Sequence, residues 1–127
     1  TFNFPCFPPN SIIMGGKYKN LQKKKDKKIP PKIIYPKGDA KITALVVEMQ
    51  PQAKMQMHYH EVPSFGFILE GKIRVQSESG DIKTFSKGDV VIEMINKKHS
   101  GVNPGVSVTK FIVFYMGTED LKNTIIE

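Results

Sequence analysis

The sequence lacks a second cysteine, since Cys6 is the only one among its 127 residues. An intramolecular disulfide is therefore excluded, and so is a zinc site built from several thiolates. No stretch reaches the roughly eighteen consecutive apolar residues that a membrane-spanning helix requires. A chain of this length can form one domain with a core of its own, so it does not need a disulfide or a structural metal to fold.

The scarcity of cysteine says little about the cellular compartment, because reducing compartments and disulfide-free periplasmic proteins both fit one free thiol. The chain begins at Thr1 rather than at a methionine, and either a leader removed before Thr1 or a trimmed chain accounts for that. Periplasmic and cytoplasmic locations both stay open.

Acidic residues are scarce in one segment, and this accounts for the net charge of +7. Residues 17–37 contain nine lysines against Asp26 alone, which gives that segment +8 and leaves −1 for the rest. Such a run is typical either of a surface that binds an anionic polymer or of a solvated loop. Because the run has no arginine and few aromatic residues, we favour the solvated loop and expect no nucleic-acid or membrane partner.

Helical periodicity is absent as well, and from residue 33 onward the pattern is one of short strands. Runs rich in β-branched and aromatic residues, or alternating in polarity, cover 42–49, 54–60, 65–69, 72–76, 82–85, 90–95 and 106–116. Glu70-Gly71 predicts a tight hairpin between two of these runs, and further turns are predicted at Gly80 and Gly88. The tail, 119–127, is predicted to form one helical turn or to extend along the body. The pattern as a whole predicts an all-β sandwich or barrel.

Composition divides the chain into two parts. Residues 1–32 form an N-terminal arm and a lysine-rich loop, and residues 33–127 form the β-barrel. Prolines at positions 5, 8 and 9 exclude a regular helix in the arm, so we expect Phe2, Phe4 and Phe7 to pack on the body or on a partner chain. We therefore predict a homodimer whose subunits contact each other through this arm or through an edge strand.

The chain has only three histidines, and two of them, His58 and His60, are one residue apart. Residues i and i+2 of a strand point to the same face, so both imidazoles are predicted to face one point. Gln56, two residues before His58, is predicted by the same alternation to face that point as well. A strand that brought His99 to that point would complete a three-nitrogen metal site. Lone histidines are more often ordinary surface or core residues, and that is the competing interpretation.

The spacing around these histidines resembles that of the cupin superfamily, small β-barrels of the jelly-roll type. The first cupin motif is His-x-His, three or four residues, Glu, six residues and Gly, and this chain matches it through His58, His60 and Gly71. The second motif is Gly, five residues, Pro-x-Gly, two residues, His, three residues and Asn, and the chain matches it through Gly88, His99 and Asn103. More narrowly, the chain resembles small single-domain bacterial cupins, a branch that implies no particular function.

The resemblance implies a cupin-type jelly-roll barrel in which His58, His60 and His99 are metal ligands. The glutamate of the first motif, normally a further ligand, falls on Ser64, so the site is predicted to be a three-histidine variant. Such a site keeps positions open for water or an anionic ligand. The implied cofactor is a divalent metal ion (iron, manganese, nickel or zinc), and the missing glutamate leaves open that the site has lost its metal.

Neighbouring residues extend the site into a predicted pocket. If Ser64 takes the glutamate position, Gly66 and Ile68 share its face, while Phe65, Phe67 and Leu69 pack against another layer. Gly66 either leaves room for a ligand or relieves crowding between the sheets.

Glu93 is the one charged residue in the apolar run 90–95, where a buried and unpaired carboxylate would be costly. One prediction is that it reaches the site as a substitute ligand, a general base or a partner of a histidine. The other is that it faces solvent or pairs with a basic residue (Lys72, Arg74 or Lys110). Asn103 is expected to hold the loop after His99 rather than to touch a ligand.

Two functions are compatible with this site. In the first, the protein is a metal-dependent enzyme, an oxygenase or an isomerase acting on a small anionic molecule, with Glu93 or Gln56 handling protons or positioning the substrate. In the second, the same pocket binds or senses a small ligand without turnover. Binding of an anionic polymer by the lysine segment is a weaker, third hypothesis.

Overall fold

The computed structural model describes residues 33–127, so the predicted arm and lysine-rich loop, residues 1–32, lie outside the described residues. In the described part, no helix is long and apolar enough to cross a membrane. Its regular structure consists of strands: β1 (Ala40–Met49), β2 (His58–Tyr59), β3 (Ser64–Glu70), β4 (Lys72–Ser77), β5 (Ile82–Ser86), β6 (Val90–Ile92), β7 (His99–Val102), β8 (Thr109–Thr118) and β9 (Ile125–Ile126).

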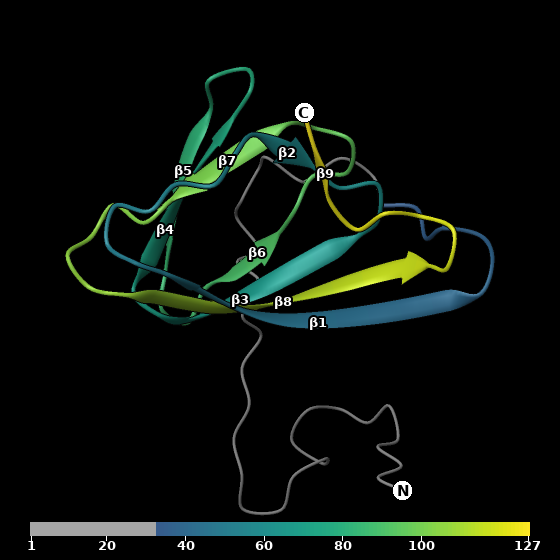
Figure 1. The fold of residues 1–127 in the computed structure, drawn as a ribbon, viewed down its shortest axis with the longest axis horizontal. Helices are drawn as coiled ribbons and strands as arrows, with labels where there is room; N and C mark the ends of the chain where they lie inside the picture. Colours follow the sequence, from purple (N-terminus) through teal and green to yellow (C-terminus); the bar gives the residue numbers. More distant parts are fainter. Residues whose placement is uncertain (1–32) are drawn as a thin grey trace, which may run out of the picture.

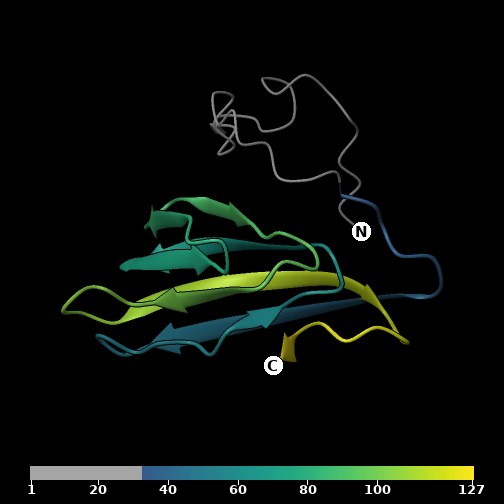
Figure 2. The same cartoon turned by 90° about the horizontal axis from the view of Figure 1, so that it is seen from above.

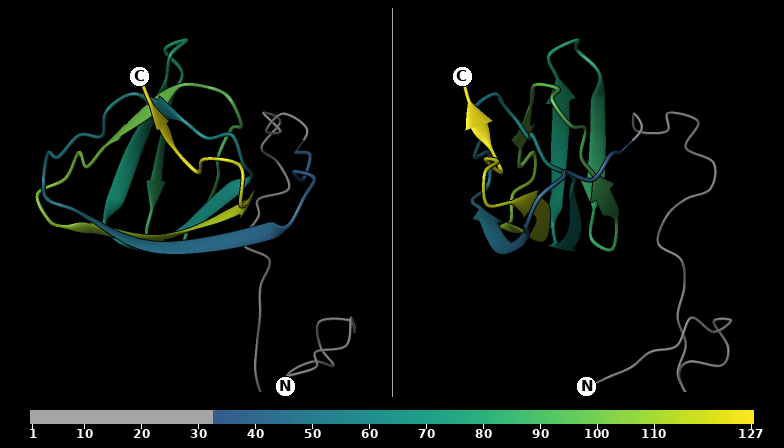
Figure 3. Two further views of the ribbon diagram at one scale, coloured as in Figure 1. Left: turned by 45° about the vertical axis from the view of Figure 1, so that its right-hand side comes forward. Right: turned by 90° about the vertical axis from the view of Figure 1, so that its right-hand side faces the viewer.

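These strands form two antiparallel sheets that face each other. The first sheet has the order β1-β8-β3-β6 and the second the order β5-β4-β7-β2-β9. In Figure 1 most of the first sheet runs along the lower side of the molecule and the second lies above it, and Figures 2 and 3 show the same layers from other directions. Most neighbours in the sheets come from distant parts of the sequence, as when β1 pairs with β8 from Ala40↔Thr118 to Met49↔Thr109. The prediction of an all-β, jelly-roll fold is confirmed.

The chain passes from the first sheet to the second between β3 and β4, and Gly71 forms the corner. The predicted hairpin at this point is wrong, because β3 pairs with β6 and β8 whereas β4 pairs with β5 and β7. The β3–β8 pairing becomes irregular between Ile68 and Glu70, and Gly71 then turns the chain with a φ of +73°. Strands change sheets at bulges and bends of this kind.

Two further predicted turns are confirmed. β4 and β5 form a hairpin, and Gly80, with a φ of +93°, lies in its turn. Gly88 adopts a φ of +89° in the turn before β6. Backbone hydrogen bonds close both turns, from Gly80 N to Ser77 O at 3.0 Å and from Asp89 N to Ser86 O at 2.9 Å.

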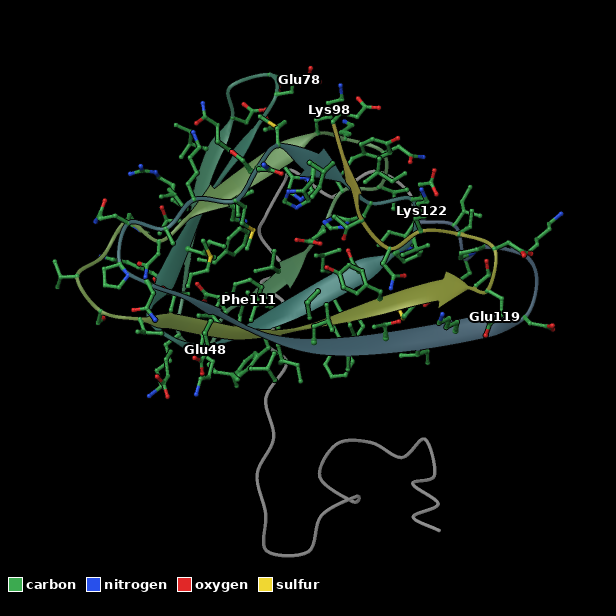
Figure 4. All side chains as sticks on the ribbon, in the orientation of Figure 1. Glu48, Glu78, Lys98, Phe111, Glu119 and Lys122 are labelled. Atoms are coloured by element: carbon green, nitrogen blue, oxygen red, sulfur yellow. The ribbon has the colours of Figure 1, made fainter. Side chains whose placement is uncertain are left out.

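The apolar core fills the space between the sheets in two clusters. One consists of Met49, Ile68 and Ile73, with the partly buried Phe111 packed against it; Figure 4 shows Phe111 between the sheets and Glu48 on the far side of the first sheet. The other cluster consists of Val62, Val113 and Tyr115. This second cluster forms a wall beside the polar interior described below.

The opposite face of the first sheet is also apolar. We call it the outer face; by strand register it carries Ile42, Ala44, Val46, Phe65, Phe67, Val90, Ile92, Ile112, Phe114 and Met116. Phe65 and Phe114 stack with ring centroids 5.2 Å apart, yet Phe65 is 36% exposed and Val46 61%. The expectation that Phe65 packs under another layer is therefore wrong for the part of the chain that the structure describes.

Candidate metal centre

The three histidines meet in one cluster between the sheets. His58 in β2 and His99 in β7 are cross-strand partners, and His60, directly after β2, forms an isolated bridge with Ile95. All three are buried, and their ring centroids lie 4.5 to 5.0 Å apart. One nitrogen of each ring lies within 4.8 Å of the others. The structure thus brings together the three residues predicted as metal ligands.

Backbone carbonyl groups orient all three rings. The Nδ1 atoms lie at hydrogen-bond distance from carbonyl oxygens, 2.7 Å for His58 and Gln56, 2.9 Å for His60 and Asn123, and 2.8 Å for His99 and Lys97. A carbonyl oxygen only accepts, so each Nδ1 carries the hydrogen and donates it. In a neutral imidazole the lone pair is then on Nε2, which is the arrangement of a metal-ligating histidine with its outer partner.

Two of these Nε2 atoms, on His60 and His99, are buried and have no hydrogen-bond partner among residues 33–127. A buried polar atom without a partner costs roughly 1–3 kcal/mol, so two of them in one cluster call for an explanation. A divalent metal ion bound by the ring lone pairs provides one, since imidazole nitrogen is a ligand for zinc, iron and nickel. The residues present therefore fit a bound metal ion.

Glu93 reaches this cluster from the first sheet. Its Oε2 atom lies 2.8 Å from Nε2 of His60 and its Oε1 atom 3.8 Å from Nε2 of His99. The contact to His60 is short enough for an ion pair, and each of the two groups shifts the pKa of the other. Glu93 thus lies at the histidine cluster. The alternative prediction, that it faces solvent or pairs with Lys72, Arg74 or Lys110, is wrong.

Burial and charge act in opposite directions on the ionisable groups of the cluster. Burial alone would lower the pKa of His60, but the adjacent Glu93 carboxylate outweighs it and raises that pKa above 6.5. Burial would likewise raise the pKa of Glu93, but His60 and a hydrogen bond from Ser64 lower it below 4.5. For His99, burial dominates and lowers the pKa. The cluster therefore favours one added positive charge beside Glu93, carried by a proton or by a metal ion.

The residues predicted to line a pocket take different positions. Ser64 is 3% exposed, and its hydroxyl group donates a hydrogen bond to Oε2 of Glu93 at 2.8 Å. A Cβ on Gly66 would lie 3.2 Å from the carbonyl oxygen of Ile112 on the neighbouring strand, so this glycine relieves crowding within its own sheet. Ile68 belongs to the apolar core beside Met49. A contact of any of these residues with a ligand stays a prediction.

Gln56 does not share the inward face of His58, and the parity prediction is wrong at this position. The strand begins only at His58. Before it the burial alternates in the opposite phase, with Met55 and Met57 partly buried and Gln56 exposed. What reaches the cluster is its backbone carbonyl, which accepts the hydrogen bond from His58. Its predicted part in catalysis has no support from this position.

Residues near the C-terminus complete the surroundings of His60, and no motif pointed to them. Besides the Asn123 carbonyl, the hydroxyl oxygen of Thr124 lies 3.2 Å from Nδ1 of His60, and the ring of Tyr115 packs with its centroid 5.5 Å away. The tail is extended, as one of the two predictions had it, and β9 pairs with β2 through His58↔Ile126. Only the apolar pair Ile125-Ile126 in a polar tail hinted at this docking.

Access to the cluster is narrow. The side chain of Glu93 is 22% exposed, against 2% for His60 and 6% for His99, so of these three side chains Glu93 has the most contact with solvent. Two hollows on the surface of the described residues lie elsewhere; one is lined by residues that include Gln56 and Ser100, and the other by residues that include Tyr59 and Lys98.

Asn103 holds the loop after His99, as predicted. It is 1% exposed, and its amide nitrogen donates to the carbonyl oxygens of Met49, Gln50 and Ser107 while its amide oxygen accepts from Gly105 N. The loop is thus tied to the end of β1, which fixes where β7 and His99 lie.

Comparison with known proteins gives a family and a fold. A family profile described as Cupin domain matches residues 45–115. Similar solved structures include the oxalate decarboxylase of Lactobacillus farciminis in a formate complex (23% identity, TM-score 0.58), the DMSP lyase DddQ of Ruegeria pomeroyi (20%, 0.58) and the oxalate decarboxylase of Bacillus subtilis, which has Mn(II) centres (21%, 0.57).

Each of these similarities covers 67% of this chain, but only 26%, 42% and 23% of the other chain, respectively. The chain therefore spans less than half the length of these proteins, and at such identities the likeness shows the fold alone. A sequence search of curated proteins finds no match.

Proposed function

The chain belongs to the cupin family, and from this membership and the histidine cluster we propose that it is a metal-binding cupin that acts on a small anionic molecule. His58, His60 and His99 hold a divalent metal ion through their Nε2 atoms. Ser64 and Gly66 border the site on the first sheet, and Ile68 closes it toward the apolar core. The ion supplies Lewis acidity, or redox chemistry if it is iron or manganese.

The observation that carries this proposal is the shared orientation of the three rings. Each Nδ1 atom donates to a backbone carbonyl, which leaves each Nε2 as an acceptor. Two of these acceptors are buried without a hydrogen-bond partner in the part of the chain that the structure describes. A purely structural histidine cluster would satisfy these atoms with donors, because unpaired buried acceptors are destabilising. The Mn(II) centres of a protein with the same fold support a divalent ion.

Charge and access support a small anion as the molecule acted on. Three neutral imidazoles leave a divalent ion uncompensated, and even with Glu93 one positive charge remains. Glu93 lies on the more open side of the cluster, so a ligand would arrive there, and the buried histidines keep bulk water from the opposite side. A similar structure holds formate, a small carboxylate. We propose oxygenase or isomerase chemistry for the site.

Non-catalytic binding or sensing of a small ligand is the second candidate, and the narrow access to the cluster favours it. The two hollows described above are lined by other residues, and His60 and His99 are almost fully buried, which favours binding of a small ligand. Oxygen consumption by iron-loaded protein with small carboxylic acids, together with analysis of the acids for isomerised products, separates the two candidates, since a sensor would bind the acids and leave both oxygen and acid unchanged.

Metal analysis of protein purified without added metal tests the proposal directly. We expect a divalent metal in the wild type, and in apoprotein reconstituted with manganese, iron, nickel or zinc, but not in a His58→Ala/His60→Ala variant. Gln56→Ala is the control, because this exposed side chain adjoins the cluster in sequence and should not alter metal content. If wild type and double variant take up equally little metal after reconstitution, the site does not bind metal.

We also propose that the protein is a homodimer in which two outer faces meet. The face is apolar, and its most exposed residues lie on β1 and β3, with Ile42 at 70%, Val46 at 61% and Phe65 at 36%. Four strands spaced about 4.8 Å apart and up to ten residues long give a face on the order of 500 Å², which approaches the roughly 800 Å² per partner of a standard interface. A second copy fits, because a two-fold interface places the same patch on both sides.

A further inference from the structure

We propose that Glu93 is the carboxylate ligand of this metal centre, and that Ser64, which stands where the cupin motif has its glutamate, is the residue that positions it. The inference rests on the metal site proposed above and adds a fourth ligand to it. It also gives Glu93 one definite role in place of the several that its sequence context left open.

Strand register is the first support, because Ser64 and Glu93 are direct cross-strand neighbours. β3 and β6 pair Phe65 with Ile92 and Gly66 with Val91, and one step further Glu93 N donates to Ser64 O at 3.0 Å. Opposite residues on paired strands point to the same face, with Cβ atoms about 4.5–5.5 Å apart. A carboxylate that moves from position 64 to position 93 therefore still starts from the same part of the same sheet face.

The contacts of the carboxylate are the second support. Oε2 of Glu93 lies 2.8 Å from Nε2 of His60, and Oε1 lies 3.8 Å from Nε2 of His99. Because Nδ1 of each ring is committed to a backbone carbonyl, a neutral ring presents a lone pair to a negatively charged oxygen. Two acceptors at that distance repel each other unless a cation lies with them.

A proton on His60 is the alternative cation, and it accounts for only part of the arrangement. A protonated His60 would pair with Oε2 of Glu93 at 2.8 Å. Nε2 of His99, however, is buried with no hydrogen-bond partner among residues 33–127 and lies 3.8 Å from Oε1 of Glu93, which is beyond hydrogen-bond distance. A metal ion accounts for both rings, because one ion can accept a lone pair from each nitrogen and from the carboxylate.

Ser64 supplies what a displaced carboxylate needs. Its hydroxyl group donates to Oε2 of Glu93 at 2.8 Å, which fixes the rotation of the carboxylate, and its small side chain leaves space that a glutamate at this position would fill. Partners of this kind orient ligands and raise metal affinity. A set of three nitrogens and one carboxylate oxygen also favours manganese or iron more than three nitrogens alone, because carboxylate is the harder ligand.

Manganese titration of the stripped protein tests this assignment. Calorimetry gives the Mn²⁺ affinity and electron paramagnetic resonance gives the ligand environment, so neither readout depends on turnover. Glu93→Gln keeps the size of the side chain and an acceptor for Ser64 but removes the charged ligand. Glu61→Gln is the matched control, since it removes the same charge from the residue next to His60.

Changes around a metal ligand cost about 10–100-fold in affinity, so we expect Glu93→Gln, which removes a ligand, to lose about 100-fold and to change the Mn²⁺ spectrum. Ser64→Ala should lose about 10-fold, and Glu61→Gln should leave the affinity unchanged. The exchange variant Ser64→Glu/Glu93→Ser should recover most of the affinity that Glu93→Gln loses, because both positions face the same point.

The outcomes separate this inference from the metal site on which it rests. Should the wild type bind Mn²⁺ while Glu93→Gln binds it with the same affinity and spectrum, Glu93 is not a ligand and the three-histidine site stands. If the wild type binds no more metal than His58→Ala/His60→Ala, the metal centre itself is wrong. Circular dichroism monitors folding; should Glu93→Gln not fold, unchanged affinity in Ser64→Ala would overturn the assignment instead.

Discussion

Replacing Gly71 with alanine tests the corner that carries the chain from the first sheet to the second. The added Cβ would lie 2.7 Å from Oγ1 of Thr109 and 2.8 Å from the carbonyl oxygen of Val108. Thr109 is fully buried, and its hydroxyl group accepts a hydrogen bond from Lys72 N at 3.1 Å and donates one to Lys72 O at 2.6 Å. The alanine must therefore displace a side chain that ties β8 to the start of β4.

The expected loss of stability follows from these contacts. A φ of +73° costs alanine about 1 kcal/mol, the two hydrogen bonds of Thr109 contribute about 1 kcal/mol each, and overpacking adds about 1–3 kcal/mol. A reduced entropy of the unfolded chain offsets about 0.4–1 kcal/mol. We therefore expect Gly71→Ala to lower the free energy of unfolding by about 3–5 kcal/mol, and the melting temperature by about 10–20 °C.

Gly80→Ala is the matched control, because Gly80 also has a positive φ, of +93°, but no atom of the described residues lies within 4 Å of a Cβ there. Only backbone strain applies, so the expected loss is about 1 kcal/mol or less. Urea denaturation followed by circular dichroism suits a chain without tryptophan. If the two variants lose the same stability, then Gly71 is not crowded by Thr109, and the description of Gly71 as the corner between the two sheets is wrong.

Further predictions concern pH, the C-terminal tail and the outer face. In metal-free protein the raised pKa of His60 contributes stability that is present below pH 6.5 and is lost as the pH rises through the folded-state pKa. The lowered pKa of His99 reduces stability only as the pH falls below 6.5, so it does not affect the range from pH 6.5 to 8. From pH 6.5 to 8, thermal denaturation should show chelator-treated protein becoming less stable and metal-loaded protein more stable, as fewer protons compete for the ligands; parallel trends would contradict this. Removing residues 123–127 deletes β9 and the carbonyl that orients His60, so calorimetry should show metal affinity falling about 10–100-fold, and unchanged affinity would exclude this role of the tail. Phe65→Glu should weaken the homodimer at least about 30-fold by light scattering without changing metal content; a dimer of unchanged strength would show that the two copies meet elsewhere.

The histidine cluster was predictable because its geometry follows from spacing. His58 and His60 lie on one face through the period of a strand, and His99 falls on a motif position at the right distance along the chain. Parity is a local rule, however, and it holds only inside a strand. It failed for Gln56, which precedes the first residue of β2.

Long-range contacts decided what local patterns left open. The turn chemistry of Glu70-Gly71 indicates a reversal, but it does not say whether the next strand returns to the same sheet; that depends on Thr109, which crowds the corner from a distant strand. Glu93 is conspicuous in an apolar run, and only its pairing with Ser64 shows which way it points. Asn123 approaches His60 from 63 residues away, a contact for which the sequence carries no signature.

The ligands proposed for the metal come from both layers of the fold. Glu93 directly follows β6 of the first sheet, while His58 and His99 belong to the second. An ion held by both sets acts as a tie across the interior, so part of its binding free energy becomes free energy of docking one sheet on the other. The sheets then cannot separate without releasing the ion, and metal dissociation and exchange of amide hydrogens on both sheets should slow together in the loaded protein.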